Sequence, residues 1–315
     1  MNTHSICLPM LVLLLISLLH CYSFSFETAT SEQITIQKVS YIDSVPEKWV
    51  HVDKPVLIEN YFTYIDSLVN QYTPLINYQL SEHIIVRANP SIITTLANTD
   101  YYRMMAKDSF VYNQRKMVIL KPNDSILIPN ALLSKKIVDT FEKTLIDINI
   151  PEFKLRIYEG DSLIYTFPIR VGKNTEKYLA MNDKLTSLQT KTGTGTIVRH
   201  VRNPDFYNPV DDRRYYYTKR DDGKTTLMPQ IPWIETELNG ERYGQMIHPT
   251  TNPNTLEKAY SNGCIGVKEA DAWIIYYYAP IGTKIQIRYD LNIKGDKGQP
   301  IKLEDIYQKD KQTKE

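Results

Sequence analysis

The sequence has little of several features that would assign it to a class at once. Lys and Arg number 37 against 36 Asp and Glu, so the net charge of +1 gives no support for nucleic-acid or membrane-surface binding. We find no internal repeat, and no apolar run reaches the roughly 20 residues of a membrane-spanning helix. The 315 residues are 42% hydrophobic and 23% charged, which excludes a disordered chain and allows a real buried core.

The longest apolar run covers the fourteen residues 6–19, close to the amino terminus. Its length fits the core of a signal peptide better than a membrane anchor or a buried helix. The segment Ser23–Ser25 then gives a small-x-small cleavage pattern, although no Lys or Arg precedes the run. We therefore expect residues 1–25 to be a signal peptide and the protein to act in the periplasm or cell envelope.

Cysteine is scarce, with three in the whole chain. If cleavage follows Ser25, Cys7 and Cys21 are removed and Cys264 is the only thiol left, so no intramolecular disulfide can form. A lipoprotein anchored at Cys21 is the less favoured alternative, because His20 stands where a small residue is expected. One thiol and a histidine fall short of the ligand set of a structural zinc site, so the count argues against such a site. A lone thiol in an oxidising compartment is instead a candidate nucleophile.

The texture of the chain divides the mature sequence into three parts. Residues 26–145 are a mixed α/β region of unknown role, whose clearest element is a helix over Asn60–Tyr72 with Asn60 as its cap. Residues 146–290 alternate apolar and polar positions in several runs, which predicts half-buried strands and a hairpin. Residues 291–315 are rich in charge and predict a solvated tail.

The chemistry is concentrated between Tyr243 and Val267, where Cys264 follows His248 by sixteen residues. The spacing permits a strand, a loop and a return that place the thiol beside the imidazole. Such a pair forms a reactive thiolate at neutral pH, so we expect Cys264 to be more acidic than a free thiol. Gly263 leaves room for an oxyanion hole made by its own N–H and that of Cys264.

The residues around Cys264 also allow a catalytic and a purely structural interpretation. Residues 268–278 predict a helix that is stopped by Pro280 and whose start favours a thiolate at Cys264. Against catalysis, Asn262-Gly263 is also a common hairpin turn, and Cys264 could be a small buried residue with His248 at a strand end. The single mature thiol favours the catalytic interpretation.

The segment resembles the bacterial L,D-transpeptidase catalytic domain of the YkuD type. The matching residues are His248-Pro249-Thr250 and Ser261 to Gly266, with the opening strands at residues 148–171 and a Thr- and Gly-rich stretch at residues 192–196. The resemblance spans roughly residues 146–290. It implies a mainly β fold, a mixed β-sandwich with one helix after the catalytic cysteine.

The resemblance also assigns roles to individual positions. It implies Cys264 as nucleophile, His248 as proton carrier, Gly263 at the oxyanion hole, and a carbonyl at Pro249 that orients the imidazole. Two positions depart from the family pattern: Pro249 replaces a glycine, and Gly266 replaces the common arginine. Candidate substrate-binding residues are Ser261, Asn262, Thr250, Trp233 and Tyr243.

An insertion at residues 203–233 is rich in Tyr and Arg and ends at Trp233. We expect this segment, the flap, to line a cleft, although a hairpin with ordinary surface arginines is nearly as plausible from the sequence. His200 lies on an alternating strand, and we assign no catalytic role to it or to His51 and His83.

The resemblance implies an exported cysteine acyltransferase of cell-wall assembly that acts on peptidoglycan stem peptides as donor and acceptor. The resemblance implies no metal and no cofactor, and no nucleic acid and no obligate protein partner are expected. Two alternatives stay open from the sequence. One is an L,D-carboxypeptidase that acts on the same stems, and the other is a non-catalytic cell-envelope binding protein that has lost turnover through the changes at Pro249 and Gly266.

Overall fold

The computed structural model describes residues 47–180, 183–208, 210–295 and 297–309. From Glu47 onward the chain forms one compact unit. The predicted signal peptide, with Cys7 and Cys21, lies outside the described residues. Among the described residues, no helix is both long enough and apolar enough to span a membrane.

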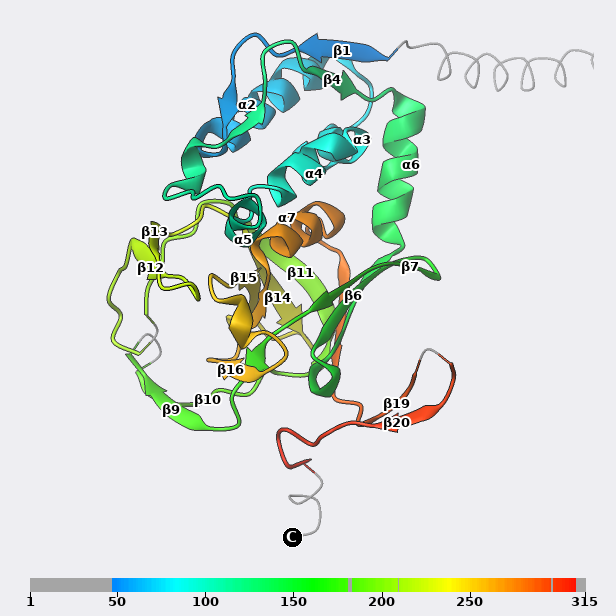
Figure 1. The fold of residues 1–315 in the computed structure, drawn as a ribbon. Helices are drawn as coiled ribbons and strands as arrows, with labels where there is room; N and C mark the ends of the chain where they lie inside the picture. The colour runs from blue at the N-terminus through cyan, green and yellow to red at the C-terminus, as the bar shows by residue number, and fades with distance from the viewer. Residues whose placement is uncertain (1–46, 181–182, 209, 296, 310–315) are drawn as a thin grey trace, which may run out of the picture. The chain divides into compact units, whose positions relative to one another are not determined.

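The first part of the described chain is a helical layer with short strands (Figure 1). Its helices are α2 (Ile58–Tyr72), α3 (Glu82–Ala88), α4 (Pro90–Ala97), α5 (Tyr101–Met105) and α6 (Ala131–Glu142). Its strands pair as β1 (Lys48–His51) with β4 (Ser125–Ile128) and β2 (Val56–Leu57) with β3 (Val118–Leu120). The helix predicted at Asn60–Tyr72 is confirmed, but the Asn60 cap is wrong: α2 begins at Ile58 after Leu57, which makes no side-chain cap bond.

The second part is built on one eight-stranded mixed sheet in the order β17-β15-β14-β11-β18-β5-β6-β7. The strands are β5 (Thr144–Asn149), β6 (Lys154–Glu159), β7 (Ser162–Pro168), β11 (Gly193–Val201), β14 (Trp233–Leu238), β15 (Met246–Pro249), β17 (Ile265–Val267) and β18 (Lys284–Arg288). The pairs β15–β17 and β18–β5 are parallel, and the other pairs are antiparallel. A bridge between Arg170 and Gly266 joins the chain after β7 to β17, so the sheet nearly closes into a barrel.

The predicted alternation explains how the sheet forms its core. Ile146 lies opposite Ile157, and Ile148 lies opposite Leu155, so these buried side chains form cross-strand pairs on one face. Phe167 continues that face on the next strand, opposite Leu155.

Smaller strand pairs surround the sheet. They are β9 (Glu176–Leu179) with β10 (Lys184–Ser187), β12 (Tyr217–Lys219) with β13 (Thr225–Leu227), β8 (Val171–Gly172) with β16 (Ala259–Ser261), and β19 (Asn292–Lys294) with β20 (Pro300–Lys302). The expectation of a solvated tail is wrong for part of the carboxyl-terminal segment. Tyr307 is fully buried, and its hydroxyl donates to Gly172 O (2.9 Å), because an aromatic ring gains from burial when its polar tip finds an acceptor.

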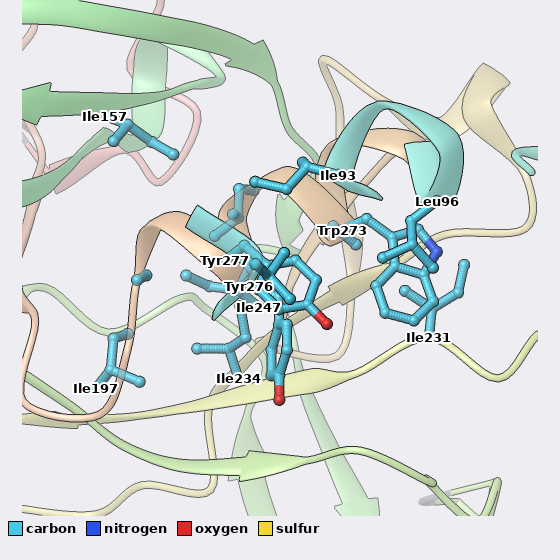
Figure 2. Packing of buried hydrophobic residues seen from close by; sticks show 14 of the residues in the cluster. Ile93, Leu96, Ile157, Ile197, Ile231, Ile234, Ile247, Trp273, Tyr276 and Tyr277 are labelled. Carbon is cyan, nitrogen blue, oxygen red and sulfur yellow. The ribbon is translucent and has the colours of Figure 1, made fainter. Parts of the chain in front are cut away.

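Helix α7 (Glu269–Tyr278) is buried on nearly every side. It contacts α3 and α4 as well as β14 and β15, so it lies between the helical layer and the sheet. Figure 2 shows Trp273, Tyr276 and Tyr277 of α7 in one cluster with Ile93 and Leu96 of α4 and apolar residues of the sheet. The predicted fold class is confirmed: a mainly β part with one helix after the cysteine, preceded by an α/β region.

Candidate active site

Two adjacent parallel strands bring Cys264 and His248 to the same place. In the pairing of β15 with β17, Ile247 lies opposite Ile265 and His248 lies opposite Gly266. Cys264 stands directly before β17, after Gly263, whose φ of +111° is a conformation that favours glycine. Both Cys264 and His248 are half-buried, so each keeps some access to solvent.

The imidazole of His248 is fixed on two sides. Nδ1 lies 2.9 Å from Pro249 O, an acceptor, so we assign the ring proton to Nδ1 and leave the lone pair on Nε2. Trp233 stacks on the ring, with centroids 4.6 Å apart and planes at 29°. The proline that departs from the family pattern therefore still offers its carbonyl to the imidazole.

The side chains of His248 and Cys264 are both neutral in the resting protein. Burial, reinforced by the guanidinium of Arg170, lowers the pKa of His248 to about 4. Burial raises the pKa of the Cys264 thiol above its ordinary value, against the opposing effects of a backbone hydrogen bond with Met246 and of Arg170. The expectation of an acidic thiol is therefore wrong, because the loss of water around Sγ outweighs the nearby positive charge.

Arg170 is the site residue that the sequence reasoning missed. Its main chain exchanges two hydrogen bonds with Gly266, of 2.9 and 3.0 Å, and Nη1 donates to Thr255 Oγ1 at 3.1 Å. The only sequence signal was a charged residue between Ile169 and Val171, which are both fully buried.

Hydrogen bonds hold the turn that carries Cys264. Ser261 Oγ donates to Cys264 O (2.5 Å) and accepts from Gly263 N (3.2 Å), and Thr190 Oγ1 donates to Gly263 O (2.9 Å). Ser261 is buried and makes its bonds within the turn. The Gly263 N–H is thus engaged in the resting state and would have to leave Ser261 to join an oxyanion hole.

The flap approaches the cysteine turn at Asn262. A cavity of about 480 Å³ is lined by Asn208, Asp211, Arg213 and Tyr215 of the flap and by Asn262. Phe206 of the flap contacts Trp233, with ring centroids 5.7 Å apart, and Trp233 in turn stacks on His248. The flap therefore lies against the candidate site.

The remaining predicted residues are placed differently. Thr250 is buried, and its N–H donates to Val267 O (2.7 Å) while its hydroxyl donates to Asn252 O (3.3 Å). Tyr243 is 49% exposed on the loop before β15. The described part of the chain contains no group of three His, Cys, Asp or Glu residues arranged to hold a metal ion.

The histidines without an assigned role make ordinary contacts. His83 Nε2 lies 3.0 Å from Tyr276 O, His200 Nε2 lies 3.0 Å from Ala279 O, and the two rings stack 5.2 Å apart. His51 Nδ1 lies 3.0 Å from Ser125 Oγ at the surface.

Comparison with known proteins identifies the region that carries this site. Residues 143–287 match the family model of the YkuD L,D-transpeptidase catalytic domain. The bounds predicted from the sequence, 146 and 290, lie three residues from the matched ones.

Individual relatives match with modest identity. "Putative L,D-transpeptidase YkuD" of Bacillus licheniformis is 31% identical over 133 residues, 42% of this chain and 58% of the relative. "Probable L,D-transpeptidase ErfK/SrfK" of Escherichia coli is 25% identical over 170 residues, 53% of this chain and 50% of the relative. The crystal structure of an L,D-transpeptidase from Xylanimonas cellulosilytica aligns over 78% of this chain and 98% of that one, with 11% identity and a TM-score of 0.35. The chain thus spans between a half and three-fifths of the length of these two curated relatives.

Proposed function

Residues 143–287 are a YkuD-type L,D-transpeptidase catalytic domain, and from this premise we propose that the protein is an exported cysteine acyltransferase of peptidoglycan. Cys264 attacks the carbonyl of the diaminopimelate-type residue in a donor stem peptide, and the peptide bond after that residue breaks. The terminal residue leaves as an amine, and the acyl group stays on Cys264 as a thioester. The side-chain amine of a neighbouring stem then takes the acyl group and releases the thiol.

The observation that carries this proposal is the state of His248. Its Nδ1 is committed to Pro249 O, and its neutral ring stands on the strand beside Cys264. A neutral imidazole accepts the thiol proton at Nε2 as Sγ attacks, and it returns that proton to the leaving amine. The same nitrogen then takes a proton from the acceptor amine. A thiol that is neutral at rest needs such a base.

The oxyanion of the tetrahedral intermediate would form beside the cysteine turn. We assign it to the N–H of Cys264 and, once released from Ser261 Oγ, to the N–H of Gly263. The hydroxyl of Thr190 holds the Gly263 carbonyl and so keeps the turn in place during this change.

Transfer to an amine requires that the thioester is not hydrolysed before the amine arrives. The flap supports this, because Phe206 and Tyr215 lie near the ring of Trp233 and the cavity beside Asn262. Excluding water from a site protects reactive intermediates from hydrolysis. We therefore expect transfer in preference to hydrolysis.

The test is product analysis with the mature protein, residues 26–315. A tetrapeptide-stem donor is supplied with and without an acceptor stem, and the products are separated and weighed by mass spectrometry. We expect cross-linked dimer from the wild type and none from Cys264→Ala, with Cys264→Ser as the variant that keeps the volume of the side chain. Trimmed tripeptide alone would make the protein an L,D-carboxypeptidase, and no product from any stem would favour the binding-protein alternative.

Export is a separate part of the proposal. It rests on the apolar run and cleavage pattern of residues 1–25. Fractionation and amino-terminal sequencing of the expressed protein test it. We expect a start near residue 26 outside the cytoplasm, whereas Met1 on a cytosolic protein would contradict export and an acylated Cys21 would indicate a lipoprotein.

A further inference from the structure

Side chains at positions 170 and 266 would compete for the same space near Cys264. Gly266 follows Cys264 by two residues and stands where the family pattern commonly has arginine. A Cβ at Gly266 would lie 2.4 Å from Nε and 2.7 Å from Cγ of Arg170, closer than real side chains approach. The side chain of Arg170, coming from the neighbouring chain segment, therefore occupies the place that a side chain at position 266 would need.

The charge of Arg170 has no counter-ion among the residues that the structure describes. Among the described residues, no carboxylate lies within 4.0 Å of its guanidinium, and the contact at Nη1 is with the neutral hydroxyl of Thr255. Its Nε is buried with no hydrogen-bond partner. The ionisable groups that act on it are the thiol of Cys264 and the phenols of Tyr215 and Tyr260. Cations that are withdrawn from water are ordinarily paired, so this one is poised for an anion that arrives with a ligand.

We propose that Arg170 is the specificity-determining residue that binds the terminal carboxylate of the donor stem peptide. This inference rests on the proposed function, which supplies the donor. In a tetrapeptide donor that carboxylate lies one residue beyond the scissile carbonyl, a step of about 3.8 Å between Cα atoms. A guanidinium matches a carboxylate through parallel N–H donors, and Nη2 together with the second N–H of Nη1 remains for it beyond the bond to Thr255.

A chemical probe tests the anion site without any peptidoglycan substrate. Iodoacetate and iodoacetamide alkylate the same thiol, but only iodoacetate carries a carboxylate. We expect the ratio of their rate constants on Cys264 to fall by about tenfold in Arg170→Gln, since a charge-assisted hydrogen bond is lost. In Arg170→Lys we expect the ratio of the iodoacetate to the iodoacetamide rate constant to fall less than in Arg170→Gln. Arg199→Gln is the control for net charge, because Arg199 pairs with Glu235 on the strand pair β11–β14.

Exchanging the two positions tests the shared volume. Arg170→Ser and Gly266→Arg each lower the alkylation ratio, the first by removing the charge and the second by forcing two side chains into one space. The double variant Arg170→Ser/Gly266→Arg restores the ratio toward the wild-type value. A double variant that stays as impaired as the single variants would overturn the claim that one charge serves from either position.

The outcomes separate this inference from the proposed function. An unchanged ratio in Arg170→Gln overturns the carboxylate site, and so does an equal slowing of both reagents, which would mean that the charge acts on the thiolate alone. With stem donors, the wild type prefers a terminal carboxylate over a carboxamide and Arg170→Gln loses the preference. If the wild type turns over neither donor, the proposed function fails while the alkylation ratio still reports on Arg170.

Discussion

Two arginines of this protein, the buried Arg220 and the half-buried Arg170, have opposite surroundings. The side chain of Arg220 is 0% exposed, forms an ion pair with Glu269, and donates to Thr226 Oγ1 (2.8 Å) and Gln114 Oε1 (3.0 Å). Its guanidinium also stacks 4.4 Å from the ring of Tyr101. Arg170 has one neutral hydroxyl partner and a buried Nε with none.

The difference separates a charge that holds the fold from a charge that we propose binds the substrate. Glu269, at the start of α7, accepts bonds from Tyr101 N (3.0 Å) and Gln114 Nε2 (2.8 Å) as well as pairing with Arg220. These contacts join the flap, the helical layer and the helix after Cys264. A fully satisfied buried network of this kind fixes one arrangement, whereas an unsatisfied cation gains from a ligand.

The largest expected loss of function comes from a substitution at His248. We expect His248→Ala to lower turnover of stem donors by about 10²- to 10⁴-fold, because the proposed general base is removed while strand pairing with β17 is kept. Single-turnover kinetics on the purified variant measure the loss. His200→Gln is the control, since the ring of His200 lies 3.0 Å from the carbonyl oxygen of Ala279 and has no part in the proposed chemistry. Equal losses in the two variants would point to a structural effect.

The largest expected loss of stability comes from a substitution at Arg220. Replacing it with Met leaves Glu269 buried without its partner, so we expect a loss of about 3–5 kcal/mol in the free energy of unfolding. Urea denaturation of the variant measures this loss. The iodoacetate to iodoacetamide ratio of the folded variant should stay at the wild-type value, and a fall in that ratio would remove the distinction between the two arginines.

Acid should lower the stability of the folded protein through His83 and His200. Burial lowers the pKa of His83 to about 3 and that of His200 to about 4, below the ordinary value of 6.5. The unfolded chain then binds more protons between about pH 6.5 and 4, so stability is lost as the pH falls through this window. Melting curves from pH 7 to 4 should show the decline. A shallower decline is expected in His83→Gln, and an identical slope would contradict the assignment.

The smallest effect is expected from Arg170→Met on stability. No carboxylate loses its partner, so the free energy of unfolding should change by less than about 1 kcal/mol, far below the change for Arg220→Met. Parallel urea titrations of the two variants give the comparison. A loss at Arg170 as large as that at Arg220 would show that Arg170 is a structural residue.

The sequence was enough for the elements with strong local signals. The helix after Cys264 was predicted at 268–278 and is found at Glu269–Tyr278, because Pro280 ends it and its apolar residues are continuous. The strands β5, β6 and β7 follow the alternation of their residues. The spacing of His248 and Cys264 predicts a strand, a loop and a return, and the structure has His248 on β15 and Cys264 directly before β17, its parallel neighbour.

The rest of the site depends on contacts between segments distant in sequence. Arg170 stands 96 positions before Gly266 in the sequence, and the two are neighbours only in the folded chain, where a bridge joins them. No local pattern in the sequence predicts that bridge. The raised pKa of Cys264 comes from desolvation, which spacing does not reveal. Tyr307 lies in a charged segment, and its burial follows from the acceptor that Gly172 offers.

The central claim is that Cys264 carries the acyl group, and intact-protein mass spectrometry tests it most directly. The mature protein is mixed with a tetrapeptide-stem donor, quenched in acid within a turnover, and digested to locate any added mass. The account predicts an acyl adduct on the peptide that contains Cys264, which is absent in Cys264→Ala and disappears when an amine acceptor is added. Product formation with an adduct on another residue, or with full activity in Cys264→Ala, would contradict it.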